Sequence, residues 1–367
     1  MEGYAELGAF DHNSTLTVFP LDKSLAHIEE QAYGGKVETD YGLFSASGNM
    51  KFQESLYFEV QVTGNFFNGT KGRRSEHKTT LRAINHVINH DDEERSINRY
   101  IKLPVTNVNI FTQLTAARIC TLLKKAAGYN EMSHTITDIY RNASEQALKE
   151  VLTAFSISDI YVSMLSIDPT RASFSQYNAP ASMMAAVSNI LLTSVDEELL
   201  DTFFTEWDKD FAPDGCIDNE DIKESIRDGQ QSLKYTNVYK QLDSFYKAYD
   251  FKSDFPEFWK FVDRNGDGIL DKQDKPDDFE ITEEELTPSK QQCIQLLEQV
   301  NKYLRDFLQT ECVWEANFCG AIGPIPDYPT TLVPTDSEVY EIWTAAYATI
   351  RQCNYCLLYT SPSPRDS

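Results

Sequence analysis

The hydrophobic pattern of this 367-residue chain changes near Pro104, and the change restricts the folds that it can adopt. Before Pro104, apolar residues alternate with polar ones over residues 15–19, 57–62 and 79–84, which is typical of β-strands. After it, apolar residues recur at helical spacing in four segments, over residues 114–127, 136–155, 183–192 and 195–204. The sequence therefore predicts an α+β protein with more than one domain.

Four regions follow from this pattern. Gly- and Asn-rich turns separate the short strands of residues 1–104, which predict a small antiparallel β-sandwich. Residues 105–278 predict a mainly helical domain that ends in an EF-hand-like loop. A further helical region is expected over residues 279–355, where two helix-start signals occur. Residues 356–367 resemble an adaptor-derived ending, and we expect them to be disordered or not native to the protein.

Residues 263–274 have the spacing of a calcium-binding loop. Calcium takes about six to eight oxygen ligands, and this loop offers oxygens at positions one, three, five, nine and twelve. A glycine at position six permits the sharp turn, and the residue at position seven offers its backbone carbonyl. The candidate Ca²⁺ ligands are therefore Asp263, Asn265, Asp267, Ile269, Asp271 and Asp274.

The residues that flank this loop favour an EF-hand on one side only. Ahead of it, Phe258, Trp259, Phe261 and Val262 have the spacing of an incoming helix. Behind it, Pro276 follows closely, and position twelve is Asp, so the loop resembles those of dockerin-type modules more than those of cytosolic sensors. The same Asp- and Gly-rich residues also favour a solvated turn without metal, and that alternative stays open.

Two other groups of polar residues are weaker metal candidates. The acidic stretch of residues 208–221 ends like the first loop, but aligning Gly215 with position six puts Ala212 where a ligand should be. It is either a longer metal loop or a set of aspartates that cap helices and turns. His86 and His90 could share a helical face, but no third zinc ligand follows at a recognisable spacing, so a solvated segment is the better interpretation.

Charge and motifs narrow the function classes. The formal net charge of −24 argues against a nucleic-acid partner, because a surface so negative repels phosphate. No stretch reaches the roughly 18 to 20 apolar residues that a membrane helix needs, so we expect no transmembrane span. The sequence contains neither Gly-x-Ser-x-Gly nor His-Glu-x-x-His, and we expect no enzymatic activity.

Several segments resemble known surface proteins. Residues 8–22, 41–44, 57–68 and 105–118 resemble a module of surface lipoproteins in Gram-negative glycan-degrading bacteria, in which a carboxypeptidase-regulatory-like β-sandwich leads into a helical domain. Residues 336–354 resemble an early helix of the SusD/RagB-like outer-membrane glycan-binding lipoproteins, with their Trp, Tyr, Ile and Asn pattern. By this resemblance the chain is the N-terminal part of such a lipoprotein.

The resemblance implies a non-enzymatic protein of the cell surface and outer membrane. It would help to capture an oligosaccharide for a partner outer-membrane transporter, and calcium would have a structural role at a domain junction. Family members are anchored through an N-terminal cysteine, whereas this chain shows neither a signal nor an early cysteine. The alternatives are a dockerin-like module that docks another protein and, as a third choice, the accessory region of a glycoside hydrolase.

Overall fold

The computed structural model describes five stretches of the chain, residues 1–46, 56–87, 103–130, 136–251 and 255–276. The chain divides into two compact units, Met1–Phe279 and Glu280–Ser367, and all described residues belong to the first unit. The helical region expected over residues 279–355, which includes the SusD-like segment, lies outside the described residues, as does the ending at 356–367.

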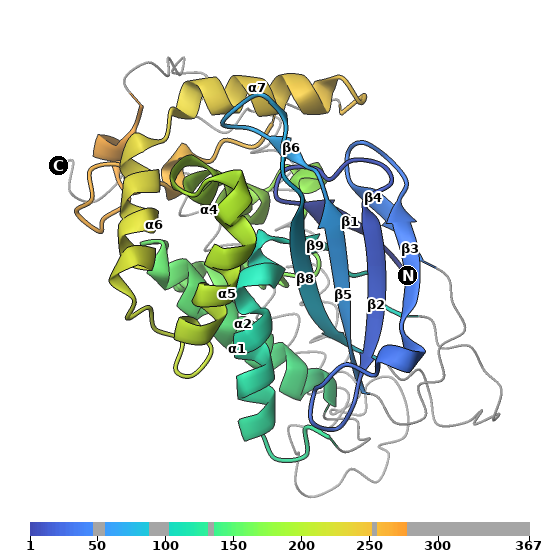
Figure 1. Cartoon of the computed structure of the whole chain (residues 1–367). Coiled ribbons are helices and arrows are strands. Elements are labelled where there is room, and N and C mark those ends of the chain that lie inside the picture. Colours follow the sequence, from blue (N-terminus) through green and yellow to red (C-terminus); the bar gives the residue numbers. More distant parts are fainter. Residues whose placement is uncertain (47–55, 88–102, 131–135, 252–254, 277–367) are drawn as a thin grey trace, which may run out of the picture. The chain divides into compact units, whose positions relative to one another are not determined.

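The strands form a seven-stranded mixed sheet (Figure 1). Its order is β8-β5-β2-β3-β4-β1-β9, and all neighbours are antiparallel except β1 and β9. β8 and β9, at the two ends of this order, also contact each other, so the sheet curls almost into a barrel. The strands are β1 (Glu2–Glu6), β2 (Thr15–Leu21), β3 (Tyr33–Val37), β4 (Leu43–Ser45), β5 (Tyr57–Gly64), β8 (Thr79–His86) and β9 (Val108–Asn109), with a separate hairpin of β6 (Phe67–Asn68) and β7 (Arg73–Arg74).

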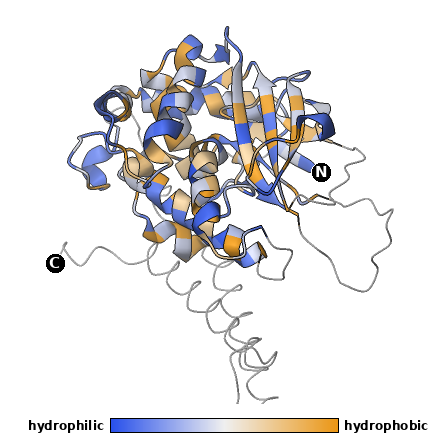
Figure 2. Cartoon of the chain, turned by 60° about the horizontal axis from the view of Figure 1, so that its bottom comes forward, coloured by the Kyte–Doolittle hydropathy of each residue, from blue (hydrophilic) through white to orange (hydrophobic). Residues whose placement is uncertain are grey.

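Both faces of the sheet are buried at its centre. Val18, Val60 and Ala83 are cross-strand neighbours on β2, β5 and β8, and none of them is exposed. Tyr57 and Ile84 point to the opposite face, where they join a hydrophobic cluster with residues of the helices. Figure 2 shows hydrophobic and hydrophilic residues alternating along the strands. The period of two therefore separates a face turned into the curl from a face covered by helices.

Seven α-helices lie beside the sheet in the described part of the chain (Figure 1). They are α1 (Ile110–Lys125), α2 (Ile136–Ala154), α3 (Ile160–Leu165), α4 (Ala179–Ser194), α5 (Leu200–Phe211), α6 (Glu220–Ser232) and α7 (Tyr235–Lys247). α1 contacts β8 as well as α2, α4 and α5, which makes it the central helix. None of the helices within the described ranges is long and apolar enough to span a bilayer.

The start of α1 joins it directly to the sheet. Asn109 is the last residue of β9 and also the N-cap of α1. Its side-chain oxygen accepts the Thr112 N–H at 3.0 Å, and its backbone N–H donates to the Thr112 hydroxyl at 2.8 Å. From α5, the Trp207 indole donates to the carbonyl of Leu114 at 2.9 Å. These bonds satisfy polar groups that would otherwise be buried without partners, so α1 can occupy the centre of the fold.

The α+β class expected from the sequence is confirmed. The clearest predicted strands and helices are present, as β2, β5, β8, α1, α2 and α4. The described strands form one curled sheet and a hairpin, where the sequence led us to expect the two packed sheets of a sandwich. The helices of α1 and α2 share a hydrophobic cluster with Tyr57 and Ile84 of the sheet, so strands and helices have a common core.

Glu6, at the end of β1, is a carboxyl group with only 1% of its surface exposed. The Ser173 hydroxyl and the Phe174 N–H each donate to it at 3.2 Å, and no described residue forms an ion pair with it. Burial raises the pKa of Glu6 to about 8, and the two hydrogen bonds oppose that shift only in part. This shift favours the protonated form of Glu6 in the folded protein at neutral pH.

We expect the free energy of unfolding to fall as the pH rises from 4.5, the ordinary pKa of Glu6, to about 8. Because the folded pKa lies above the unfolded one, the folded state binds more protons in this window, and the stability is lost as the pH rises through it. Urea unfolding of Glu6→Gln should show a flatter pH dependence, with a difference on the order of a few kcal/mol across the window. Glu224→Gln, at an exposed glutamate of α6, should keep the wild-type slope. Equal slopes for wild type and Glu6→Gln would contradict the prediction.

Candidate metal centre

Three buried phenylalanines anchor the segment that leads into the candidate calcium loop. Phe255, Phe258 and Phe261 contact Phe174, Tyr235 and Tyr161 respectively, with ring centroids 4.6–5.7 Å apart. The prediction of an α-helix before the loop is wrong, because the segment forms only the single 3₁₀ turn η5 (Trp259–Phe261). Its apolar residues are buried by these separate aromatic contacts, and the short span between Pro256 and the loop leaves little room for a helix.

The carboxylate of Asp263 organises the first half of the loop. Asp263 is 3% exposed, and it accepts the N–H of Gly266 at 2.8 Å and that of Gly268 at 2.9 Å. Both glycines have positive φ angles, +75° and +78°, which a residue with a side chain rarely adopts. The loop therefore wraps its backbone around its first carboxylate.

Asp274 closes the loop from its other end. This carboxylate is 2% exposed and accepts the N–H groups of Arg264 at 2.8 Å, Asn265 at 3.2 Å and Asp271 at 3.0 Å. Asp274 ends a short 3₁₀ turn, η6 (Lys272–Asp274), in which Asp271 and Asp274 form a capping box. The first and last ligand candidates thus both point into the loop.

The other candidates lie on the exposed side of the loop. Asn265, Asp267 and Asp271 are exposed, and each accepts the backbone N–H two residues further on, at 2.6–2.9 Å. The Asn265 side-chain amide also donates to Asp267 at 3.0 Å. Ile269 is 60% exposed. Asparagine and aspartate favour such turns, so this half of the loop has the local geometry expected of a polar turn.

The loop has the donor chemistry for a hard cation. No described lysine, arginine or histidine forms an ion pair with Asp263 or Asp274. A carboxylate oxygen has two lone pairs, so one that accepts an N–H can still bind a cation. Within the described ranges, no three His, Cys, Asp or Glu side chains are already grouped so that they could hold a metal. Binding here would therefore need the exposed side chains to turn inward.

The second acidic stretch, residues 208–221, has protein partners for several of its carboxylates. Asp208 pairs with Arg82 of β8 at 2.5 Å. Asp210 accepts the N–H groups of Asp218 and Asn219 at 2.9 and 3.1 Å, at the start of α6. These contacts support the capping and turn role that the sequence left open for this stretch.

A guanidinium group supplies the positive charge in this second loop. Arg118 of α1, whose side chain is 5% exposed, donates to the carbonyls of Ala212, Pro213 and Asp214 at 3.2, 2.9 and 2.9 Å. It also makes a two-pronged pair with Glu150 of α2, at 2.7 and 2.9 Å. The hydrogen bonds with Glu150 raise the pKa of Arg118 further, so it stays charged. Three successive carbonyls are therefore held by an arginine, as a metal ion would hold them.

Sequence reasoning did not single out Arg118 and Glu150. They lie 32 residues apart in the chain, and the loop lies 94 to 96 residues beyond Arg118, so no local spacing relates them. Of the two histidines weighed as zinc ligands, His86 lies in strand β8 and not on a helix, and His90 lies outside the described residues.

Searches against protein-family models, curated protein sequences and solved structures found no match to this chain.

We expect Arg118→Ala to lower the free energy of unfolding by roughly 3–5 kcal/mol, because it leaves Glu150 and three carbonyls without their shared donor. Arg118→Lys should recover only part of this loss, since an ammonium group lacks the planar fork that reaches both sides. Urea unfolding followed by circular dichroism measures both effects. Arg227→Ala, at an exposed arginine of α6, is the matched control and should stay within about 0.5 kcal/mol of wild type. An Arg118→Ala protein as stable as this control would refute the assigned role.

Proposed function

We propose that this chain is a non-enzymatic calcium-binding protein of the cell surface, in which one calcium ion at residues 263–274 has a structural role. The observation that carries the proposal is the burial of Asp263 and Asp274, two carboxylates whose recorded partners are all backbone N–H groups. A cation would offset the unfavourable free energy of removing two like charges from water. The exposed side chains at loop positions three, five and nine and the carbonyl at position seven would complete an all-oxygen ligand set.

The position of the loop supports a structural role for the ion. The loop ends at Asp274, five residues before the boundary between the two compact units at Phe279. An ion bound to both ends of the loop would restrict the backbone where the chain leaves the first unit. This EF-hand- or dockerin-like loop would then act as a staple, without the helix opening of a calcium sensor.

The glycan part of the proposal rests on the resemblance of the sequence to surface lipoproteins. Under it, residues 8–22, 41–44, 57–68 and 105–118 correspond to the lipoprotein module, although their described strands form one curled sheet and a hairpin, and residues 336–354 begin a SusD-like region. The chain would help to deliver an oligosaccharide to an outer-membrane transporter. A glycan array probed with the purified chain tests this part. A chain that binds calcium but none of the glycans would remove the glycan role and leave the metal site.

One observation favours the dockerin-like alternative. Ile269, inside the loop, has 60% of its surface exposed, and an exposed apolar residue beside a metal loop suits contact with another protein. The two roles differ in what chelation does. A structural ion alters stability without altering assembly, whereas a docking loop loses its partner when calcium is removed.

We expect calorimetric titration of calcium into the purified chain to show one site, with a Kd of roughly 10⁻⁴ to 10⁻³ M if the loop is of the extracellular kind. The double variant Asp263→Ala/Asp267→Ala should lose this binding. The double variant Asp214→Ala/Asp218→Ala removes the same number of charges from the second acidic loop and should keep it. Equal heats from wild type and the Asp263→Ala/Asp267→Ala protein would sink the proposal.

Calcium should also stabilise the fold. At a free concentration of about one hundred times Kd, a site present only in the folded state adds about 2.7 kcal/mol to the free energy of unfolding. We expect urea unfolding with calcium and with a chelator to differ by about that amount for wild type and the Asp214→Ala/Asp218→Ala protein. The Asp263→Ala/Asp267→Ala protein should show no difference, and size-exclusion chromatography should show no change of assembly. A stability that does not depend on calcium would exclude the structural role.

A further inference from the structure

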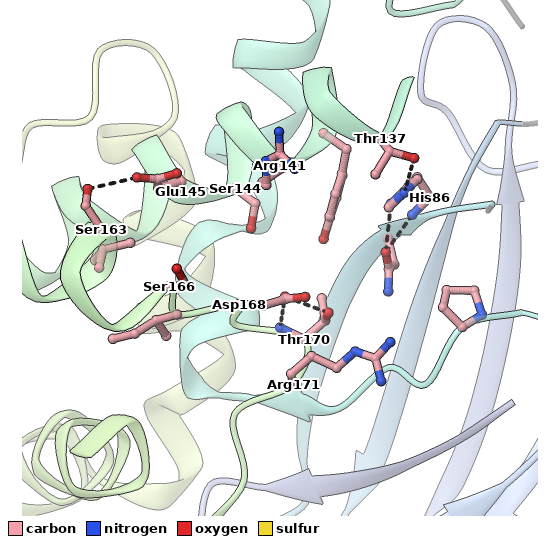
Figure 3. Close-up of a pocket in the computed structure, with 15 residues that line it drawn as sticks. His86, Thr137, Arg141, Ser144, Glu145, Ser163, Ser166, Asp168, Thr170 and Arg171 are labelled. Carbon is pink, nitrogen blue, oxygen red and sulfur yellow. Dashed lines mark hydrogen bonds between the residues drawn. The ribbon is translucent and has the colours of Figure 1, made fainter. Parts of the chain in front are cut away.

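A cavity of about 290 Å³ lies between the end of strand β8, one face of α2, the short helix α3 and the loop that follows it (Figure 3). From α2 it is lined by Thr137, Tyr140, Arg141 and Ser144, whose spacing puts them on one helical face. His86 contributes from β8, and the loop after α3 contributes the opposite wall. The cavity contains none of the residues of the candidate metal loop.

Buried asparagines hold the loop that forms this opposite wall. The Asn107 side chain donates to the carbonyl of Ala172 at 3.0 Å, and that of Asn109 donates to the carbonyls of Pro169 and Ala172, each at 2.9 Å. Both asparagines are at most 3% exposed. Asn107 directly precedes strand β9, and Asn109 is the last residue of β9 and the N-cap of α1, so these amides fix the loop to the centre of the fold. Its cavity-lining side chains therefore project from a defined backbone.

The inner wall of the cavity is uncharged and largely aromatic. The rings of His86 and Tyr140 stack with their centroids 4.6 Å apart. Burial lowers the pKa of His86 to about 4, so its imidazole is neutral, and its two nitrogens lie 3.1 Å from Asn85 and Thr137. Tyr140 donates its hydroxyl to the carbonyl of Ile84 at 2.7 Å. These groups have partners and present an aromatic surface to the cavity.

Three other groups that line the cavity have unused hydrogen-bonding or charge capacity. The Ser144 hydroxyl is buried, in a residue that is only 4% exposed, and it makes no hydrogen bond of standard geometry, although the Tyr140 hydroxyl lies near it. Asp168 accepts the N–H and hydroxyl of Thr170 on one oxygen, and no described residue donates to the other. Arg171 makes no side-chain hydrogen bond or ion pair with any described residue, and it does not pair with Asp168 three positions away. Figure 3 shows Ser144 and Asp168 projecting from opposite walls.

The remaining charges at the cavity already have partners. Arg141 pairs with Asp138, and Glu145 accepts the Ser163 hydroxyl at 2.9 Å and pairs with Lys149 at 2.9 Å. One carboxylate and one guanidinium are therefore left over, on the same loop and beside the same apolar wall. A ligand that matches both must carry a negative and a positive group.

We propose that this cavity binds a small zwitterion, a free α-amino acid with an apolar side chain. The guanidinium of Arg171 takes the carboxylate and Asp168 takes the ammonium group. The side chain lies against Tyr140 and the apolar residues Val162 and Ile167 of the lining, and the Ser144 hydroxyl supplies a further hydrogen bond. This binding role goes beyond the calcium and glycan functions proposed above.

Size and charge favour this ligand over others. Cavities for drug-sized ligands measure roughly 300–1,000 Å³, so a cavity of about 290 Å³ suits a single building block and not an oligomer. The net charge of −24 opposes the approach of a simple anion to Arg171, whereas a zwitterion carries no net charge. A simple cation would leave the guanidinium unmatched, and an uncharged sugar would leave both charges unmatched.

Calorimetric titration of the full chain with L-valine, L-leucine and L-phenylalanine tests the proposal. At least one should bind saturably, with a Kd between about 1 µM and about 1 mM. Two analogues of leucine separate the contacts: leucinamide lacks the carboxylate, and 4-methylpentanoate lacks the ammonium group. Each should bind at least about tenfold more weakly than leucine, because one protein charge loses its match.

Variants link each contact to its residue. Arg171→Gln should abolish the preference for leucine over leucinamide, and Asp168→Asn the preference over 4-methylpentanoate. Ser144→Ala should weaken binding by about threefold to tenfold while leaving the free energy of unfolding unchanged or higher, since the hydroxyl makes no hydrogen bond of standard geometry that the change would remove. Arg227→Gln, at an exposed arginine away from the cavity, should bind like wild type. Circular dichroism checks that each variant is folded.

Three results would overturn the proposal. The first is no saturable heat with any of the three amino acids up to about 10 mM, a concentration that would detect even millimolar binding. The second is equal binding of leucine and its two analogues. The third is wild-type affinity and selectivity in folded Arg171→Gln and Asp168→Asn proteins.

Discussion

The guanidinium group of Arg118 is the contact on which the arrangement of the helices depends. It lies on α1, pairs with Glu150 on α2, and holds three carbonyls of the turn between α5 and α6. Arginine suits this position because its five N–H donors lie in one plane and stay charged when buried. The turn also needs a glycine at position 215. Gly215 has φ +83°, and a Cβ added there would lie 2.1 Å from a carboxylate oxygen of Glu150. The guanidinium of Arg118, the backbone of Gly215 and the carboxylate of Glu150 therefore fix how α1, α2, α5 and α6 are arranged.

The same helix, α1, also connects the helices to the sheet. Its N-terminus continues directly from β9, and the asparagines at that junction reach the loop after α3. Arg82 of β8 also pairs with Asp208 of α5, the residue that directly follows Trp207, whose indole donates to α1. Strands and helices that the hydrophobic pattern separates at Pro104 are therefore joined by polar contacts made across that boundary. The helical region and the strands share one core, because α1 contacts strand β8 as well as α2, α4 and α5.

Local patterns in the sequence predicted the parts of the fold that depend on local contacts. β2, β5 and β8 are long enough for their alternation to show, and α2 has an amphipathic face, so each was recognisable. β1 and β9 were missed, because they are short and their parallel pairing joins residues about one hundred positions apart, Ala5 with Val108. The segment at Phe258 has helical spacing but buries its rings against three different elements, and so the expected helix does not form. Helical spacing alone cannot distinguish a segment that forms a helix from one whose side chains are buried against separate elements.

The candidate calcium loop and the cavity also differ in how much of each could be predicted from local sequence patterns. The six candidate calcium ligands lie within twelve consecutive residues, so their oxygens could be predicted from the sequence, whereas the burial of Asp263 and Asp274 required the structure. The cavity takes residues from positions 85 to 171, and its unmatched charges, Asp168 and Arg171, are ordinary surface residues in the sequence. What makes them a candidate site is the presence, beside them, of an apolar wall and a buried hydroxyl that makes no hydrogen bond of standard geometry. Asp168 and Arg171 are exposed, so neither charge by itself favours a ligand, but a pair of opposite charges beside an apolar cavity wall is matched by a ligand that brings both.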